Sequence, residues 1–344
     1  MNKRILIEEQ GEKAYSFIAQ YLNVEEVNVE VVKTIRKFNI RKISSQKSGI
    51  VNLNKINDIN KMNNFFKLVG DKLDEGGLFI GCVETKLERR KRIFKKYPMG
   101  IAHIYYFFDF IFKRVFSKLW ITKWLYFFVT AGRNQVLSKA EALGRLAYCG
   151  FEIIEDTEID NLIYFAVKKL KTVESVKEPR FSILFKMNRI GKYGEPIDVY
   201  KIRTMHPYAE YLQDYIYKVN NLEKGGKFKD DYRITSWGKI LRKFWIDEIP
   251  MVVNVIKGQL KLIGVRPLSK HYLSLYSNEL KDKRKEVKPG LVPPYYSDLP
   301  NTLEEIMESE LRYINAFNQN PITTDFKYCY KATVNIFIKR ARSN

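Results

Sequence analysis

Two adjacent carboxylates, Asp247 and Glu248, lie at the centre of a stretch that is otherwise rich in cations. Cations gathered around two carboxylates fit chemistry on a substrate that is more negative than the carboxylates, such as a diphosphate. Helix capping is the alternative, because Asp247 suits an N-cap, Glu248 suits the first helical turn and Pro250 is tolerated there. The basic and aromatic residues around the pair include Arg233, Lys239, Arg242, Lys243, Trp245, Lys257 and Arg266.

The stretch from Asp230 to Pro267 resembles the catalytic core of a known family, the bacterial sugar transferases, which are monotopic polyprenyl-phosphate glycosyl-1-phosphate transferases. Its sequence departs from the family pattern at Met251, where the family has Gln, and at Val265, where it has Pro. The many matching positions in one stretch make the resemblance specific. They are Arg233, Thr235, Gly238, Leu241, Arg242, Lys243, Asp247, Glu248, Pro250, Asn254, Gly258, Gly264, Arg266 and Pro267.

A second stretch, residues 181–205, has alternating residues on both sides of a turn that contains Gly191 and Gly194, which predicts a β-hairpin. Alternation places Lys201 and Arg203 on one face of the second strand, where paired cations would hold a phosphate. Charges that protect an exposed strand edge are the alternative. The stretch also resembles the bacterial sugar transferases, at Arg189, Gly191, Gly194, Tyr200, Lys201, Arg203, Thr204 and Met205.

The resemblance implies a reaction in two displacements at phosphorus. Asp247 would attack the sugar-bearing phosphorus of a UDP-sugar and release UMP, and the phospho-sugar would then pass to undecaprenyl phosphate. This reaction initiates the assembly of a glycan such as a capsule, an exopolysaccharide or an O-antigen. Glu248 would hold Mg²⁺, the implied cofactor. The cations that the resemblance assigns to substrate phosphates are Arg189, Lys201, Arg203, Arg233, Arg242 and Arg266.

An inactive scaffold or regulator of glycan assembly at the membrane is the alternative function. It is motivated by Met251, by Val265 and by the segment after Gly290, which reads VPPYYSDLP in this chain and T-G-x-x-Q in the family. The intact pair of Asp247 and Glu248, with its surrounding cations, favours catalysis.

The chain of 344 residues is strongly basic, with a formal net charge of +21 at pH 7 and a pI near 9.6. Such a charge fits nucleic acid, an anionic membrane surface or phosphorylated substrates. No stretch resembles a nucleic-acid-binding module, so we expect no nucleic-acid partner. The three cysteines lack metal-binding spacing, and the N-terminal stretch lacks the apolar core of a signal peptide. We therefore expect a monotopic protein on the cytoplasmic face of a bacterial inner membrane, in contact with anionic lipid; the sequence specifies no oligomeric state.

The elements that must position the site belong to an α/β fold. Residues 50–53 read as a strand, 56–73 as an amphipathic helix, 78–83 as a buried strand, and 140–170 as a helix followed by two strands. This order resembles the C-terminal half of a class I methyltransferase-like Rossmann fold. Residues 1–47 contain no glycine-rich turn of the kind that binds S-adenosylmethionine, so we expect a degenerate, non-catalytic domain; methyl transfer is the alternative.

A basic and aromatic insertion interrupts this domain at residues 99–131, after the strongly basic run 86–96. Charged residues break its apolar runs below the ~18–20 residues that a spanning helix needs. On a helix, Asp109, Lys113, Arg114, Ser117 and Lys118 form a narrow polar stripe. A broad aromatic face beside a polar stripe predicts a helix in the membrane interface, with its cations toward anionic lipid; an ordinary core helix is the alternative. The residues that we expect to contact lipid are Tyr105, Phe108, Phe112, Phe116, Trp120 and Trp124.

These patterns divide the chain into four parts. They are an unassigned segment (1–47), the degenerate methyltransferase-like domain with its insertion (48–170), a polar linker (171–180) and an α+β membrane-associated sugar-1-phosphate transferase domain (181–344). Related transferases carry a re-entrant membrane helix where this chain has the polar linker. Our hypothesis is that the insertion takes over the anchoring role.

Overall fold

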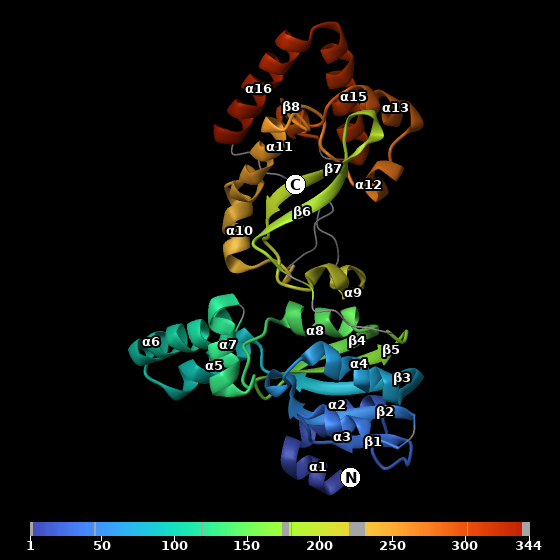
Figure 1. Ribbon diagram of the computed structural model, residues 1–344, viewed down its shortest axis with the longest axis vertical. Helices are drawn as coiled ribbons and strands as arrows, with labels where there is room; N and C mark the ends of the chain where they lie inside the picture. The colour runs from blue at the N-terminus through green and yellow to red at the C-terminus, as the bar shows by residue number, and fades with distance from the viewer. Residues whose placement is uncertain are drawn as a thin grey trace. The chain divides into compact units, whose positions relative to one another are not determined.

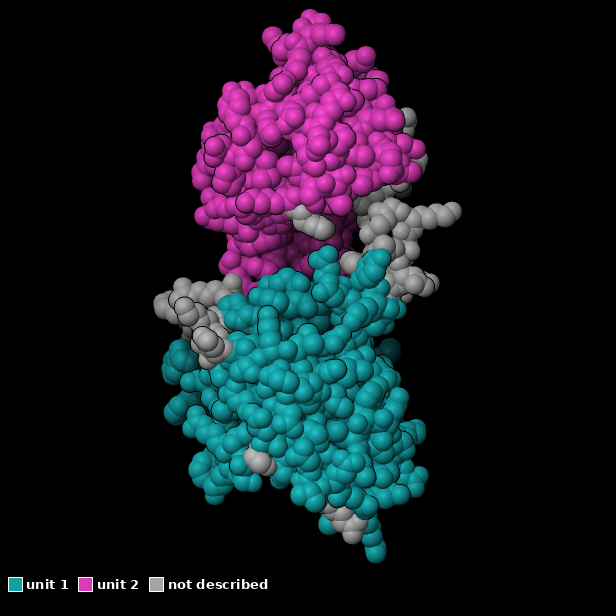
Figure 2. All heavy atoms as spheres, turned by 90° about the vertical axis from the view of Figure 1, so that its right-hand side faces the viewer, with its two compact units in different colours: residues 1–179, 206–219 teal, residues 180–205, 220–344 magenta. Residues whose placement is uncertain are grey.

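The computed structural model describes residues 3–44, 46–117, 120–173, 179, 181–219, 231–300 and 302–338. The chain folds into two compact units (Figure 2), and both contain helices and strands. Unit 1 comprises residues 1–179 and 206–219, and unit 2 comprises residues 180–205 and 220–344. The segment 206–219 thus packs in unit 1, although the chain on both sides of it belongs to unit 2.

A five-stranded sheet forms the centre of unit 1 (Figure 1). Its order is β1-β2-β3-β5-β4; β1, β2 and β3 run parallel, and β5 runs antiparallel to both of its neighbours. The strands predicted at residues 50–53 and 78–83 are confirmed within β2 and β3, and both are longer than predicted. The strand bounds are β1 (Val29–Val32), β2 (Lys47–Lys55), β3 (Leu73–Val83), β4 (Phe151–Ile159) and β5 (Leu162–Lys169).

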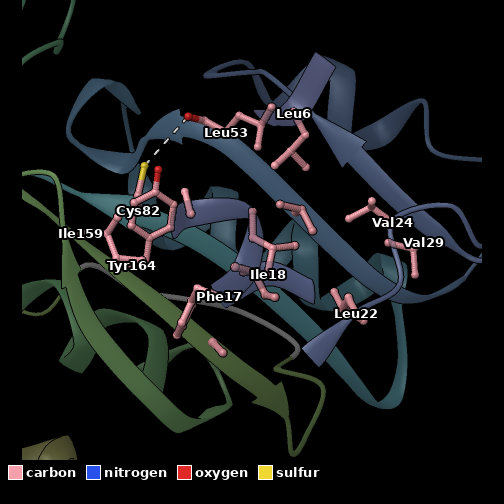
Figure 3. Close-up of a cluster of buried hydrophobic side chains, with 14 residues drawn as sticks. Leu6, Phe17, Ile18, Leu22, Val24, Val29, Leu53, Cys82, Ile159 and Tyr164 are labelled. Atoms are coloured by element: carbon pink, nitrogen blue, oxygen red, sulfur yellow. Dashed lines mark hydrogen bonds between the residues drawn. The ribbon is translucent and has the colours of Figure 1, made fainter. Parts of the chain in front are cut away.

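One face of this sheet is covered by α1 (Lys3–Gln10) and α2 (Glu12–Tyr21). Ile18 of α2 is fully buried in a cluster that includes Leu53 of β2 and Tyr164 of β5 (Figure 3). Burial of aliphatic and aromatic side chains of this kind stabilises the layer by about 25 cal/mol per Å² of apolar surface. Side chains between Leu6 and Val29 are therefore part of the core of unit 1.

The opposite face is covered by α4 (Met62–Lys72) and α8 (Lys139–Tyr148), which pack against each other (Figure 1). The rings of Phe66 in α4 and Phe79 in β3 have centroids 6.2 Å apart. Helices on both faces explain why the parallel strands are apolar on both sides. Two short helices complete this part of the unit, α3 (Lys37–Arg41) and η1 (Ile56–Asp58).

The predicted insertion and the basic run before it form three helices that project together from one side of the sheet (Figure 1). They are α5 (Lys86–Lys96), α6 (Met99–Phe110), which continues into the π-helical turn η2 (Ile111–Val115), and α7 (Trp120–Thr130). Within the described part of the chain, no helix combines the length and the apolar character that are needed to cross a bilayer.

The polar stripe of the insertion faces the interior of unit 1. Asp109 is buried and accepts two hydrogen bonds from the guanidinium of Arg89, at 2.6 and 2.9 Å, and Lys113 Nζ lies 2.8 Å from the same carboxylate. Arg114 Nη1 lies 2.5 Å from the buried carboxylate of Glu141 in α8. The prediction that these cations face anionic lipid is therefore wrong for Lys113 and Arg114, because acidic residues inside unit 1 compensate them.

The apolar face of the insertion is exposed where three of the predicted lipid contacts lie. Tyr105, Phe108 and Trp124 have 44%, 64% and 68% of their surface exposed. Phe112 and Phe116 are half-buried, and their rings have centroids 5.9 Å apart. These two pack inside the helical hairpin, so the outward face is narrower than predicted.

The other aromatic and basic residues of this region differ in how far they are exposed. Trp120 begins α7, but its side chain and the whole of Lys118 lie outside the described residues. Phe107 and Phe128, which the sequence patterns did not single out as lipid contacts, are 59% and 83% exposed. The exposed cations of the basic run in α5 are Arg90, Lys91, Arg92, Lys95 and Lys96.

Unit 1 ends with the segment 206–219, which forms η4 (Ala209–Leu212) and α9 (Gln213–Val219). Tyr208, immediately before η4, is fully buried and has a left-handed backbone with φ of 64°. A backbone conformation of this kind is unfavourable for a bulky residue, so the surrounding contacts must hold it.

Unit 2 begins with the predicted β-hairpin, which the structure confirms. β6 (Leu184–Ile190) pairs antiparallel with β7 (Pro196–Ile202), and Met187 lies opposite Val199. The turn η3 (Lys192–Gly194) has positive φ at its last two residues. Gly194 adopts its φ of 80° without strain because it has no side chain.

The remainder of unit 2 is mostly helical and encloses a two-stranded parallel ladder, β8 (Lys261–Ile263) with β9 (Gly290–Val292). Tyr313 and Ile314 are fully buried beside this ladder. The helices are α10 (Ser236–Lys243), η5 (Ile246–Met251), α11 (Val252–Ile256), α12 (Lys270–Ser274), α13 (Asn278–Glu286), α14 (Tyr295–Asp298), α15 (Leu303–Gln319) and α16 (Pro321–Phe337).

Candidate active site

The acid pair lies in the first turn of the short helix η5. Trp245 precedes this helix with φ of 55° and occupies the cap position, and no side chain caps it. The alternative that Asp247 is an N-cap is therefore wrong. Asp247 is only 8% exposed, and burial raises the pKa of its carboxyl group, with a further contribution from Glu248; Lys201 acts in the opposite direction.

Glu248 projects into a pocket of about 170 Å³. Its Oε1 lies 2.5 Å from Nζ of Lys201, which comes from β7. Arg189 and Arg266 also line this pocket and add positive charge to it. The full lining is Met187, Arg189, Val199, Lys201, Glu248, Met251, Arg266, Pro267, Leu268, Ser269, Tyr272, Leu291, Pro293 and Tyr295.

Two arginines of the pocket differ from Lys201, which forms an ion pair with Glu248. In the described part of the chain, neither Arg189 nor Arg266 forms an ion pair; Arg189 donates a hydrogen bond of 2.8 Å to the carbonyl oxygen of Asn188. Burial lowers the pKa of Arg189, and the positive charge of Arg266 lowers it further. Two guanidinium groups that repel each other across a pocket favour an anionic ligand between them.

The hairpin positions these groups by simple alternation. Arg189 in β6 and Lys201 in β7 both face the pocket because side chains two residues apart share a face of a strand. Arg203 lies beyond the end of β7, and its guanidinium is 4.9 Å from the ring centroid of Phe185 and outside the pocket lining. The two cations that the sequence pattern placed on one face therefore have different surroundings.

The chain just after β7 supports the helix before the acid pair. The carbonyl oxygen of Thr204 accepts hydrogen bonds of 2.9 Å from both the backbone N–H and the hydroxyl of Thr235. Gly238 lies so close to the same carbonyl that a β-carbon there would overlap with it. The hydroxyl of Thr204 accepts a hydrogen bond of 2.9 Å from Nε of Arg242. The matching Thr and Gly positions of the motif thus fix α10 and Arg242 against the end of the hairpin.

Asn254 fixes β7 from the other side. It is fully buried; its Oδ1 accepts from the backbone N–H of Tyr200 at 3.1 Å, and its Nδ2 donates to the carbonyl oxygen of Asp198 at 2.7 Å. One side chain therefore holds the strand that carries Lys201 next to the helix that follows Glu248. Its position in the motif was evident from the sequence, but its role was not.

Arg233, one of the predicted phosphate-binding residues, has a structural role instead. It is 5% exposed and forms a two-pronged ion pair with Asp231, with N–O distances of 2.7 and 2.8 Å. It does not line the pocket. In this arrangement Arg233 stabilises the turn before α10.

The acidic residue Glu248 at the pocket fits a magnesium ion that is bound mainly by the phosphates of the substrate and by water. Among the described residues, no three His, Cys, Asp or Glu side chains are grouped as a metal site. Mg²⁺ is usually bound through one or two carboxylates together with water and substrate phosphates, and Glu248 supplies one carboxylate in the pocket wall.

Residues from the segment that departs from the family pattern also line the pocket. Pro293 and Tyr295 belong to the VPPYYSDLP stretch, and Tyr272 contributes from α12. Sequence reasoning missed all three; the aromatic residue next to two prolines was a signal for Pro293 and Tyr295, but not for Tyr272. Met251, where the family has Gln, is 3% exposed and packs with Val199, so its apolar character suits its place.

Large apolar side chains are exposed on both sides of the acid pair in the sequence. Phe244, which follows α10, is 60% exposed, Ile249 of η5 is 59% exposed and Ile256 of α11 is 81% exposed. Such a surface is uncommon on soluble proteins and marks an interaction site. Its other exposed members are Trp237, Ile240, Val252 and Val253.

Comparison with known proteins gives a consistent family signal. The family model described as bacterial sugar transferase matches residues 162–339, which are more than half of the chain. The chain is similar to the uncharacterized sugar transferase EpsL of Bacillus subtilis (strain 168), with 38% identity over 135 residues, 39% of this chain and 57% of that relative.

Two further relatives have names that state a sugar substrate or a reaction. The chain is 32% identical to the galactosyl transferase CpsE of Streptococcus agalactiae serotype III (strain NEM316) over 46% of its own length and 36% of that relative. It is 32% identical to the UDP-N-acetylgalactosamine-undecaprenyl-phosphate N-acetylgalactosaminephosphotransferase of Aeromonas hydrophila over 40% of its own length and 31% of that relative. The chain thus spans about half or less of the length of the curated relatives it matches.

Proposed function

The chain belongs to the bacterial sugar transferase family, and on this premise we propose that it transfers a sugar-1-phosphate from a UDP-sugar to undecaprenyl phosphate. The products would be UMP and a lipid-linked sugar that initiates a capsule, exopolysaccharide or O-antigen. The observation that carries the proposal is the pocket that Glu248, Lys201, Arg189 and Arg266 line together. Asp247 precedes Glu248 in the sequence; it is buried and is not itself part of the pocket lining.

The proposed chemistry has two steps that balance at phosphorus. A carboxylate oxygen of Asp247 attacks the phosphorus that bears the sugar, and the bond from that phosphorus to the bridging oxygen of the diphosphate breaks, which releases UMP. A phosphate oxygen of undecaprenyl phosphate then attacks the same phosphorus, and the bond to Asp247 breaks. Asp247 regains its free carboxylate, so the enzyme is ready for another turnover.

The cations of the pocket would make an attack by one anion on another possible. Arg189 and Arg266 lack acidic partners in the described structure and would bind the diphosphate oxygens, and Lys201 would add a third positive charge. Glu248 would hold Mg²⁺, which supplies charge neutralisation of the diphosphate. Burial raises the pKa of Asp247; Lys201 and Arg242, which is fixed by Thr204, counteract this rise and so favour the reactive, ionised form.

We place the protein at the cytoplasmic face of a bacterial inner membrane as a monotopic protein. Its exposed apolar surfaces support this, both on the insertion 99–131 and on α10 and α11. In the insertion Asp109 and Arg114 form ion pairs inside unit 1, whereas Tyr105, Phe108 and Trp124 are exposed, and this arrangement suits a helix in the interface of a bilayer. Exposed cations of α5 would add attraction to anionic lipid.

For the first half of the chain we propose a degenerate methyltransferase-like domain over residues 48–170, followed by the linker 171–180 and the transferase domain 181–344. Within this range, the strand order β2-β3-β5-β4, with one antiparallel strand beside the parallel ones, supports this proposal. The sheet also includes β1, so the structure extends the domain toward the N-terminus into the segment 1–47. Most of the linker, residues 174–178 and 180, falls outside the described residues.

The test is UMP release from a panel of UDP-sugars with Mg²⁺ and undecaprenyl phosphate, with the wild type compared to Asp247→Asn. Release that requires the lipid and is lost in Asp247→Asn supports the transferase and identifies its sugar. Asp282→Asn, a change at an exposed acid of α13, is the matched control and should retain activity. No release from a folded, membrane-bound wild type with any sugar would favour the inactive scaffold instead.

A further inference from the structure

The segment 206–219 is built into unit 1 as a core element. Tyr208, Ala209, Leu212 and Ile216 are each fully buried. The chain enters this segment directly from Met205, one residue after the Thr204 that supports Arg242 in unit 2. Four fully buried side chains in so short a stretch indicate an attachment rather than a passing loop.

Tyr208 is the centre of the attachment. Its hydroxyl oxygen accepts hydrogen bonds from Nδ2 of Asn63 at 2.7 Å and from Nη1 of Arg145 at 3.1 Å. The guanidinium of Arg145 also lies 4.5 Å from the centroid of the Tyr208 ring. Gly144 gives this residue its space, because a β-carbon at that position of α8 would overlap with the Tyr208 carbonyl oxygen.

Polar contacts fix the two ends of the segment. At its start, the ring nitrogen Nε2 of His206 lies 3.4 Å from Nζ of Lys86, the first residue of α5. Near its end, the Tyr215 hydroxyl donates a hydrogen bond of 2.7 Å to Asp156 of β4. The segment therefore contacts the helices, the sheet and the start of the insertion within one unit.

A relay of buried charges leads from Tyr208 to the insertion. Arg145 Nη2 donates to Oε1 of Glu141 at 3.2 Å, and the other oxygen of Glu141 lies 2.5 Å from Nη1 of Arg114 in the π-helical turn η2. Glu141 is fully buried, and Arg114 also donates to the carbonyl oxygen of Val136 at 2.7 Å. Since a buried charge that loses its partner is strongly destabilising, the members of this relay should order or loosen together.

We propose that residues 206–219 are an anchor segment, held by its contacts with the rest of unit 1, and we call these contacts the grip. We further propose that the relay Arg114–Glu141–Arg145–Tyr208 couples the grip to the docking of the insertion, that is, to its packing on the rest of unit 1. Lipid that binds the outward face of the insertion favours its docked state, and by linkage it favours the gripped anchor segment. The chain that leads out of β7 is then held most firmly when the protein is on a membrane. The lipid part of this inference rests on the proposed function.

Hydrogen–deuterium exchange of the full-length protein tests the grip. Tyr208→Phe removes only the hydroxyl, so amides of residues 206–219 should exchange roughly tenfold faster, with Tyr211→Phe in the same segment as the matched control. Protected amides of β2 and β3 show in the same experiment that unit 1 remains folded. Gly144→Ala, which displaces the Tyr208 backbone, should act in the same direction. Equal exchange in Tyr208→Phe and Tyr211→Phe would overturn the grip.

The coupling is tested by adding vesicles of phosphatidylcholine and phosphatidylglycerol. In the wild type, vesicles should slow exchange of the anchor segment, and in Glu141→Gln they should slow exchange of the insertion but leave the anchor segment unchanged. A vesicle effect on the anchor segment that persists in Glu141→Gln overturns the coupling. Vesicles that alter no region of the wild type refute the membrane part of both proposals, whereas the UMP assay tests the chemistry separately.

Discussion

The candidate site contains cations without an ion-pair partner among the described residues and one cation that already forms an ion pair. Arg189 and Arg266 face the pocket without an ion-pair partner among the described residues, whereas Lys201 already neutralises Glu248 at 2.5 Å. A ligand with a diphosphate would find the two arginines ready to bind. Lys201 must divide its charge between the ligand and the carboxylate.

Replacing Lys201 by Met should lower UMP release by roughly 100-fold, because a positive group near the reacting phosphorus is lost. Lys257→Met is the control, since Lys257 contacts Tyr200 on the exposed side of the hairpin and does not line the pocket. Initial rates at saturating UDP-sugar measure the effect. Equal rates in the two variants would remove Lys201 from the site.

Removing divalent cations with EDTA should abolish UMP release but leave the melting temperature of the ligand-free protein unchanged. The physical reason is that Glu248 offers one carboxylate in the pocket, so the ion depends on the phosphates of the substrate for its other ligands. Thermal unfolding followed by circular dichroism, with and without EDTA, is the measurement. A clear drop in melting temperature on chelation would point to a metal site within the protein itself.

At the scale of elements, the insertion shows what a helical pattern can and cannot predict. The sequence pattern placed the polar stripe and the aromatic face correctly on opposite sides, because both follow from the period of the helix. Its prediction that the cations of the stripe face lipid was wrong. Lys113 pairs with Asp109, one helical turn away, and Asp109 is buried by its contact with the distant Arg89. Arg114 pairs with Glu141, which is also distant in the sequence.

Replacing Asp109 by Asn should lower the free energy of unfolding by about 3–5 kcal/mol, because the buried guanidinium of Arg89 keeps only part of its compensation. The exposed substitution Asp282→Asn should change stability little. Urea unfolding at neutral pH gives both values. Similar values for the two variants would show that the insertion is not held by its ion pairs.

The same group predicts how stability depends on pH. Burial opposes ionisation of Asp109, but the hydrogen bonds from Arg89 and Lys113 outweigh it and lower its pKa below 3.8. A carboxyl group whose pKa is lower in the folded state stabilises the fold above its unfolded pKa, and this contribution is lost as the pH falls through the folded value. The stability difference between wild type and Asp109→Asn should therefore shrink as the pH is lowered below about 4 in urea titrations. A constant difference would contradict this.

The outward face of the insertion makes a separate prediction. The double substitution Phe108→Ser with Phe128→Ser should move most of the protein from the membrane to the soluble fraction, because each ring contributes about 1.5–3 kcal/mol on burial. Phe38→Ser is the control, since Phe38 is 61% exposed on α3, outside the insertion. Flotation with vesicles measures the bound fraction. Unchanged binding of the double variant would leave the exposed surface of α10 and α11 as the principal contact.

At the scale of the whole chain, the sequence was sufficient where neighbours in sequence are also neighbours in space. The β-hairpin, four strands of the sheet and the acid pair with its motif are of this kind, whereas β1 lies in a segment that the sequence left unassigned. The pocket lining was only partly predictable, because its residues come from segments as far apart as Met187 and Tyr295. The placement of residues 206–219 in unit 1 could not be predicted, since nothing local distinguishes a helix that packs on one unit from a helix that packs on the other.

The anchor segment also determines how this protein can be dissected. A cut at the linker near residue 180 would look natural from the sequence, but the C-terminal fragment would carry Leu212 and Ile216 without the surface that buries them. The N-terminal fragment would in turn present an open groove beside Gly144. Each half would expose apolar surface to solvent and tend to aggregate. In gene fusions, truncations or natural rearrangements, the two halves should therefore remain on one chain, unless residues 206–219 are kept with the N-terminal half.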